Sequence, residues 1–202
     1  NATVIVTDGE RHVMFIEDSL KKGVYKPESL ISAVVNKGYL LYIKVGQFEF
    51  TAQTYMIPVA PLRNIQFVPD VEKDNFFTIQ DKSNTTSSYV EYIVYSRNSE
   101  LEEFVEIARF YNYSLSTYDV NQFFKPPAEK LSFPAGSVVI RNKYSMNRDH
   151  ERYVRSLLSE TEWRGGWFDV LHGNLHTNIS AGGVGYFSAS TVVSDTTIIN
   201  TN

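Results

Sequence analysis

Alternation of hydrophobic and polar residues dominates the N-terminal part of the chain and predicts β-strands. Residues 4–6 (VIV) form a first short strand, the pair Asp8-Gly9 is typical of a tight turn, and residues 12–16 (HVMFI) form the hairpin partner. Two longer strands are predicted at 39–45 and 47–57. In the second of these, apolar and polar residues alternate, which indicates that one face of the strand is solvated.

Strand signals continue along the rest of the chain. The polar run 81–88 (DKSNTTSS) predicts an exposed loop, and a strand rich in β-branched and aromatic residues follows it. The strands predicted beyond residue 60 cover residues 65–68, 89–95, 137–141, 167–171 and 186–199.

Two segments have the end signals of helices. In residues 26–38, Pro27 occupies a first helical position, Leu30, Ile31 and Val34 form an apolar stripe, and Gly38 supplies a left-handed stop. In residues 147–160, Asn147 can cap the first turn, where the helix dipole favours the acidic Asp149. Its apolar stripe consists of Tyr153, Val154, Leu157 and Leu158. Helices are therefore predicted over both ranges.

The strongest helix signal covers residues 99–111. Ser99 and Glu102 have the S-x-x-E spacing of a capping box. Apolar residues recur behind it with helical spacing, and they include Phe104. A buried Phe104 predicts a loss of about 3–5 kcal/mol for the substitution Phe104→Ala.

Together these elements predict one mixed α+β domain over residues 1–202. Its main body is an antiparallel β-sheet, arranged as a sandwich or a partly open barrel, with about three helices packed on it. The Ser/Thr-rich segment 184–202 carries little charge, so we expect it to act as an assembly arm. Deletion of residues 192–202 should then block assembly and leave the domain folded.

Composition narrows the possible functions. The 202 residues include 14% aromatic residues, no cysteine, and a formal net charge of −4. A chain without cysteine has no disulfides, thiolate metal sites or cysteine nucleophile. The acidic balance argues against a nucleic-acid partner, and no apolar run is long enough to insert into a membrane. The first residue, Asn1, indicates a fragment, a proteolytic N-terminus or an omitted preceding stretch.

One motif has the spacing of a metal site. Asp169, His172 and His176 form D-x-x-H-x-x-x-H, and on a helix these three positions share one face. A carboxylate with two imidazoles can hold zinc or iron(II), so a metal-dependent hydrolase is one alternative function. The adjacent Gly173-Asn174 pair interrupts any helix there, and we expect no catalytic residue, no metal and no cofactor.

A second alternative is an extracellular carbohydrate-binding or adhesin-type module. Trp163 and Trp167 could stack on sugar rings, and Asn174 and Asn178 could donate hydrogen bonds to hydroxyl groups.

The leading hypothesis is a non-enzymatic structural protein. We expect a subunit of a virus or bacteriophage particle (head, collar or tail) that associates with copies of itself or with other structural subunits through edge strands and loops. Its expected location is the virion or the extracellular space, with the cytoplasm left open.

Overall fold

A computed structural model describes residues 2–30, 32–80, 86–98, 102–116, 131–163 and 173–200. The chain divides into two compact units, which are treated separately below. Residues 1–58, 147–162 and 170–191 make up the first unit, and residues 59–146, 163–169 and 192–202 make up the second. No helix in the described part of the chain is long and apolar enough to cross a membrane.

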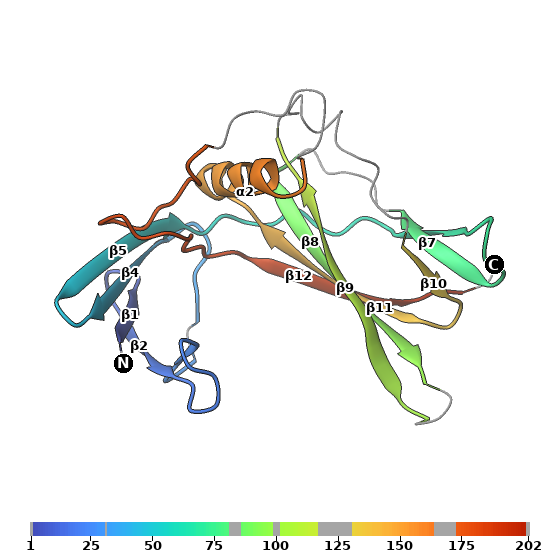
Figure 1. The fold of residues 1–202 in the computed structure, drawn as a ribbon, viewed down its shortest axis with the longest axis horizontal. Helices are drawn as coiled ribbons and strands as arrows, with labels where there is room; N and C mark the ends of the chain where they lie inside the picture. Colours follow the sequence, from blue (N-terminus) through green and yellow to red (C-terminus); the bar gives the residue numbers. More distant parts are fainter. Residues whose placement is uncertain are drawn as a thin grey trace. The chain divides into compact units, whose positions relative to one another are not determined.

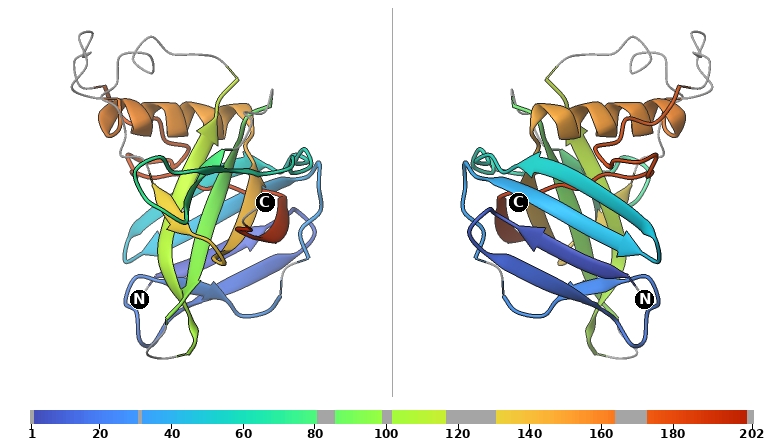
Figure 2. Two further views of the ribbon diagram at one scale, coloured as in Figure 1. Left: turned by 90° about the vertical axis from the view of Figure 1, so that its right-hand side faces the viewer. Right: turned by 90° about the vertical axis from the view of Figure 1, so that its left-hand side faces the viewer.

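A five-stranded antiparallel sheet in the order β3-β2-β1-β4-β5 forms the first unit, with its strands side by side in Figure 2. The strands are β1 (Thr3–Thr7), β2 (His12–Glu17), β3 (Tyr25–Pro27), β4 (Gly38–Val45) and β5 (Phe48–Tyr55). The predicted hairpin is present, because Val4 of β1 pairs with Phe15 of β2. Gly9 in the turn between them has φ 90°, a left-handed conformation that glycine adopts without strain.

Two antiparallel sheets form the second unit. The larger has the order β12-β11-β8-β9, with β8 (Ser88–Arg97), β9 (Phe104–Ser114), β11 (Val138–Ser145) and β12 (Val192–Ile198) (Figure 1). The smaller has the order β10-β7-β6, with β6 (Gln66–Pro69), β7 (Phe76–Gln80) and β10 (Ser132–Pro134).

The core of the second unit joins residues from both of its sheets. Phe77 of β7 and Phe133 of β10 pack in one cluster with apolar residues of the larger sheet. The members from β8, β11 and the segment after β12 are Val90, Tyr92, Val94, Val139 and Ile199. One face of the larger sheet is therefore turned toward this core, since residues at alternate positions of a strand share a face.

Two cations of β11 also lie on the core side of the larger sheet. Arg141 is only 2% exposed and donates from Nε to Asp195 Oδ1 of β12 at 2.8 Å and from Nη2 to the Arg63 carbonyl at 3.0 Å. The fully buried Lys143 donates from Nζ to the Pro61 carbonyl at 3.2 Å. These bonds compensate the cost of burying two charges.

The C-terminal segment predicted as an assembly arm supplies β12, which pairs with β11 over seven residue pairs from Val138↔Ile198 to Tyr144↔Val192. Among the described strands, β12 pairs with β11 alone. Its part in assembly stays a prediction.

The predicted helix at 147–160 is confirmed as α2 (Arg148–Glu160). Asn147 caps it as expected, since its side-chain oxygen accepts a hydrogen bond from the His150 amide at 2.8 Å. Val154 and Leu158 of the predicted apolar stripe are buried. The described residues are mainly antiparallel strands with this one helix, so a β-rich fold is confirmed and the prediction of about three helices is wrong.

The helix predicted at 26–38 is absent from the described residues: β3 ends at Pro27, residues 28–30 and 32–37 belong to no helix or strand, and β4 begins at Gly38. Pro27 pairs with Phe15 as part of the sheet, and the Glu28 amide donates to the Met14 carbonyl at 2.8 Å. Leu30, counted toward the apolar stripe, is fully exposed. Sheet pairing therefore outweighed the local capping signals.

The helix predicted at 99–111 is also wrong. From Phe104 onward this segment is strand β9, which pairs with β8, and residues 99–101 lie outside the described part. Glu102 has a φ of 53°, outside the helical region, and the Asn98 amide donates to the Glu103 carbonyl at 2.8 Å. Phe104 is 53% exposed and is not a core residue.

Candidate functional site

The metal motif is only partly within the described residues. Asp169 and His172 lie outside them, as do Trp167 and the strand predicted at 167–171. In the described ranges, no three His, Asp or Glu side chains are close enough to hold a metal ion. The motif and its hydrolase function therefore stay untested predictions.

The third member of the motif, His176, has a structural partner. Its Nε2 lies 2.8 Å from Asp149 Oδ1 in the first turn of α2, and the Tyr186 hydroxyl donates to Asp149 Oδ2 at 3.1 Å. Tyr186 also stacks on His150, with ring centroids 4.9 Å apart. Burial lowers the pKa of His150 to about 4, although the charge of Asp149 acts in the opposite direction. These contacts attach the segment around His176 and Tyr186 to the helix.

The candidate sugar-binding residues are in different environments. Trp163 is 3% exposed, so its ring is not available as a stacking surface. The Asn178 side chain donates to the carbonyls of Gln53 and Phe187 and accepts from the Phe187 amide, all between 2.8 and 2.9 Å. This leaves Asn178 little capacity for a sugar hydroxyl. Asn174 is exposed.

A different group of side chains stands out on the larger sheet of the second unit, on the face opposite the core. We call this group the tyrosine face and define it by Tyr89, Glu91, Arg109, Tyr111, Tyr113, Asn142 and Tyr144. Strand register aligns them in rows across the sheet, because Tyr89 pairs with both Tyr113 and Tyr144, and Glu91 pairs with both Tyr111 and Asn142. Paired residues of antiparallel strands have side chains on the same face.

The centre of the tyrosine face is Glu91, which is 7% exposed. Its Oε1 accepts from Arg109 Nη1 at 2.7 Å and from the Tyr111 hydroxyl at 3.1 Å. Its Oε2 accepts from Asn142 Nδ2 at 3.0 Å and from the Tyr144 hydroxyl at 3.3 Å. Burial disfavours the charge of Glu91, but these four hydrogen bonds outweigh burial and lower its pKa.

The hydrogen bonds around Glu91 extend across the whole sheet. Asn142 Oδ1 accepts from the Ser194 hydroxyl of β12 at 2.7 Å, so side chains of all four strands are linked in one network. On the other side, Arg109 donates from Nε and Nη2 to both carboxylate oxygens of Glu106, at 2.9 and 2.8 Å. A connected network of this kind holds its side chains in one arrangement.

The tyrosine rings pack mainly on one another. Tyr89 stacks on Tyr144 with centroids 4.7 Å apart and planes 8° apart, and it contacts Tyr113 at 5.9 Å. Burial, together with the neighbouring charges, raises the pKa of Tyr89 to about 12. Tyr111 and Arg109 remain 48% and 43% exposed, the latter for its side chain. The tyrosine face thus combines a rigid base with exposed aromatic and cationic groups.

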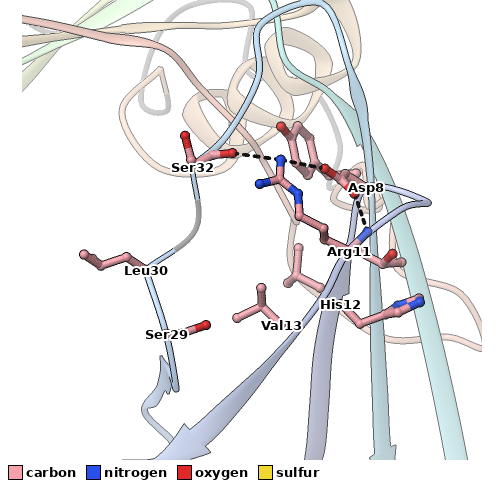
Figure 3. Close-up of a pocket in the computed structure, with 10 residues that line it drawn as sticks. Asp8, Arg11, His12, Val13, Ser29, Leu30 and Ser32 are labelled. Atoms are coloured by element: carbon pink, nitrogen blue, oxygen red, sulfur yellow. Dashed lines mark hydrogen bonds and ion pairs between the residues drawn. The ribbon is translucent and has the colours of Figure 1, made fainter.

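The first unit carries a small cavity of about 280 Å³ beside the β1–β2 turn, which we call the hairpin pocket. Its wall includes Asp8, Arg11, Val13, Ser29, Leu30 and Ser32. In Figure 3, Arg11 and Val13 lie on the hairpin, and Ser29, Leu30 and Ser32 lie on the facing segment.

The two charged groups of the hairpin pocket, Asp8 and Arg11, differ in how many short hydrogen bonds they make. Asp8 Oδ1 accepts from the amides of Arg11 and Glu10 at 2.8 and 3.1 Å, and Lys37 Nζ lies 3.2 Å from Oδ2. The two amides, with Lys37, lower the pKa of Asp8 far below its ordinary value. Arg11, in contrast, makes two long contacts, both from Nη2: 3.3 Å to Asp8 Oδ2 and 3.4 Å to the Ser32 carbonyl.

Sequence reasoning did not find the tyrosine face. A signal was present, because Tyr89 and Glu91 alternate with core residues, and Arg109 and Tyr111 alternate with Ala108 and Phe110, which pack against the core. Interpreting residues 99–111 as a helix hid the second set, since a helix would scatter these side chains around its axis.

Comparison with known proteins gives a family. No curated protein and no solved structure matches the chain. The sequence model of a family described as "Domain of unknown function (DUF4249)" matches residues 1–196, nearly the whole length. The chain therefore belongs to the DUF4249 family.

Proposed function

We propose that this protein is a non-enzymatic assembly protein, and that a second copy of the chain binds to its tyrosine face. The observation that carries the proposal is the saturated Glu91 network, with exposed Tyr111 and Arg109 standing on it. Tyr and Arg are enriched among the residues that dominate binding energy at protein interfaces. Side chains already held in place lose little conformational entropy on association.

Charge on the tyrosine face favours self-association. Arg109 of the face lies beside Glu106, with side chains 43% and 37% exposed, so the tyrosine face and its border present both signs. In a two-fold symmetric dimer each residue meets the same surface of its partner, and a face with both signs can pair with itself. Beside it, Val192 at the sheet edge is 48% exposed and extends the face with an apolar group.

Ring geometry favours a protein partner over a sugar. A sugar ring stacks on the open face of an aromatic ring, but Tyr89 and Tyr144 have their faces against each other at 4.7 Å. A carbohydrate-binding function therefore has less support here than assembly. In this proposal, the two sheets of the second unit are the layers of a sandwich, with the tyrosine face on the outside.

The location of such an assembly goes beyond this argument. A virus or phage particle, an extracellular site and partners other than a second copy stay predictions, and the chemistry of the tyrosine face does not distinguish between them.

Oligomeric state in solution tests the proposal. Light scattering after size exclusion, over a range of concentrations, should show a dimer or larger oligomer of the full chain. Tyr111→Ala should weaken association about tenfold or more, since a central aromatic anchor contributes roughly 2 kcal/mol. Val192→Asp should weaken it as well, by placing an unpaired charge in the contact without touching the Glu91 network.

Tyr55→Ala provides the matched control. Tyr55 is 49% exposed, almost the same as Tyr111, and its hydroxyl also donates one hydrogen bond, to the Asn36 carbonyl at 2.6 Å. It belongs to the first unit, so its removal should leave association unchanged. A chain that remains monomeric throughout, or equal weakening by Tyr111→Ala and Tyr55→Ala, would refute the proposal.

A further inference from the structure

The hairpin pocket has a donor group that its own surroundings leave largely unused. Arg11 carries five N–H donors, and its side chain is 57% exposed. Among the described residues, its contacts all come from Nη2, at 3.3 and 3.4 Å, both longer than the usual 2.9–3.0 Å. Nε and Nη1 are left for a further acceptor, and a guanidinium is shaped to bind a carboxylate through two parallel hydrogen bonds.

The local charge balance selects the kind of anion. Lys37 Nζ lies 3.2 Å from Asp8 and 3.1 Å from Glu10, so that one cation serves two carboxylates. With Arg11 included, two positive and two negative charges meet around the turn. These charges balance, so the attraction for an anion comes from the unused Nε and Nη1 donors of Arg11. Repulsion by the carboxylates of Asp8 and Glu10 is weaker for a monoanion than for a dianion such as phosphate.

The rest of the hairpin pocket is suited to an apolar group. Val6 and Val13 contribute apolar side chains to its wall, while the fully exposed Leu30 lies at its rim with its side chain directed away from Val13 (Figure 3). A volume of about 280 Å³ corresponds to roughly nine water-sized groups at about 30 Å³ each. This is the size of a carboxylate joined to a short branched chain.

The facing wall of the pocket is anchored at both ends. The Glu28 amide donates to the Met14 carbonyl at 2.8 Å, before Ser29. After Ser32, the Val34 amide donates to the Tyr39 hydroxyl at 2.6 Å. These two hydrogen bonds tie the described residues on either side of the facing wall to β2 and to β4.

We propose that the hairpin pocket binds a carboxylate attached to a short apolar group, with Arg11 binding the carboxylate and Val6 and Val13 contacting the apolar part. Two sources share this chemistry: the C-terminal residue of a peptide and a free aliphatic carboxylate. The site lies in the first unit and does not depend on the tyrosine face of the second.

Calorimetric titration of the full chain with three probes tests this site. The probes are N-acetyl-Gly-Gly-Leu with a free C-terminus, the same peptide as its C-terminal amide, and 4-methylpentanoate. The free acid should bind about tenfold or more tightly than the amide, because hydrogen bonds to a charged group are lost with the carboxylate. Tighter binding of the peptide acid than of 4-methylpentanoate indicates a chain terminus, and equal or weaker binding indicates a small free acid.

Variants identify the groups responsible. Arg11→Gln should lower affinity for the peptide acid about tenfold or more, and Arg11→Lys should retain part of it. Leu30→Asp gives a second test. Because Leu30 is fully exposed, the substitution should leave the fold intact, and the new carboxylate at the rim of the pocket would repel the probe. Lys44→Gln is the matched control, since Lys44 is a half-exposed cation of the same unit with one carboxylate partner, Glu49 at 2.9 Å.

Three results would overturn the proposal: no binding of either carboxylate probe, equal binding of peptide acid and peptide amide, or unchanged affinity in both Arg11→Gln and Leu30→Asp. Equal loss of affinity in Lys44→Gln would also contradict it, because the attraction would then be a general effect of charge.

Discussion

Two polar clusters of this protein treat their charged groups in opposite ways. On the tyrosine face, Glu91 is 7% exposed and accepts four hydrogen bonds from side chains of two neighbouring strands. In the hairpin pocket, the Arg11 side chain is 57% exposed and makes two long contacts from one nitrogen. A saturated group stabilises the surface that carries it, while an unsaturated one has capacity for a ligand.

The two clusters also differ in how far apart in sequence their partners are. Asp8 receives its backbone hydrogen bonds from residues two and three positions away, within one turn. Glu91 is bound by residues 18 to 53 positions away. The backbone hydrogen bonds to Asp8 form with their turn, but the Glu91 network forms only when the whole sheet has assembled. Substitutions in the Glu91 network should therefore affect folding more.

Removal of β12 should give the largest effect. Deletion of residues 192–202 removes the Asp195 partner of the buried Arg141 and the fully buried Ile199. Loss of one partner of a buried pair costs about 3–5 kcal/mol, and loss of a core residue costs a similar amount. We expect the second unit to unfold, measured by near-ultraviolet circular dichroism and urea denaturation.

This expectation reverses the prediction from sequence that the truncated domain stays folded. Val192→Asp, a point change in the same strand at an exposed position, should keep the fold and serves as the control. A truncated chain with an unchanged urea midpoint would mean that β12 contributes little to the core.

Glu91→Ala should give an intermediate effect. It leaves the donors of Arg109, Asn142, Tyr111 and Tyr144 without their shared acceptor, and we expect a loss of about 2 kcal/mol in the free energy of unfolding. Glu106→Ala removes an exposed carboxylate bound to the same Arg109 and should have a much smaller effect. If urea denaturation showed the same loss of stability for Glu91→Ala and Glu106→Ala, the buried carboxylate would contribute no more than the exposed one.

The pH dependence of Glu91→Ala provides a second measurement. Because the pKa of Glu91 is lower in the folded chain, its stabilisation is complete above the pKa of an unfolded glutamate and is lost as the pH falls through the folded value. The difference in stability between wild type and Glu91→Ala should therefore narrow in acid. If the difference in stability between wild type and Glu91→Ala did not change with pH, Glu91 would not stabilise the fold through its ionised form.

Phe104→Ala should give the smallest effect. Phe104 is 53% exposed at the start of β9, beyond the register shift at Val94/Tyr95, and we expect a change below about 1 kcal/mol. Phe110→Ala is the contrasting variant, because Phe110 stacks on Tyr92 with centroids 4.9 Å apart and packs against the core. It should cost about 3 kcal/mol in thermal or urea unfolding. If Phe104→Ala and Phe110→Ala lowered the free energy of unfolding by similar amounts, Phe104 would have to be a core residue.

Local sequence was sufficient to predict those elements whose structure depends mainly on their own residues. The β1–β2 hairpin follows from alternation and the Asp8-Gly9 turn, and α2 follows from the Asn147 cap and its apolar stripe. Segments 26–38 and 99–111 also had good helix signals, but pairing with β2 and with β8 was stronger. A single sequence does not show that competition, because the paired strands contribute hydrogen bonds and burial that no local window contains.

The sequence by itself determined the strand-rich character of this protein, its capped helix and the residue types available for chemistry, because these depend on side-chain periodicity and short-range hydrogen bonds. Only the tertiary structure decided that Glu91 meets Arg109, Tyr111, Asn142 and Tyr144, that Trp163 is buried, and that Arg11 faces a cavity. The physical reason is strand register: a shift of one residue would turn every side chain of a strand to the other face of its sheet, and register is set by partners far away in the chain.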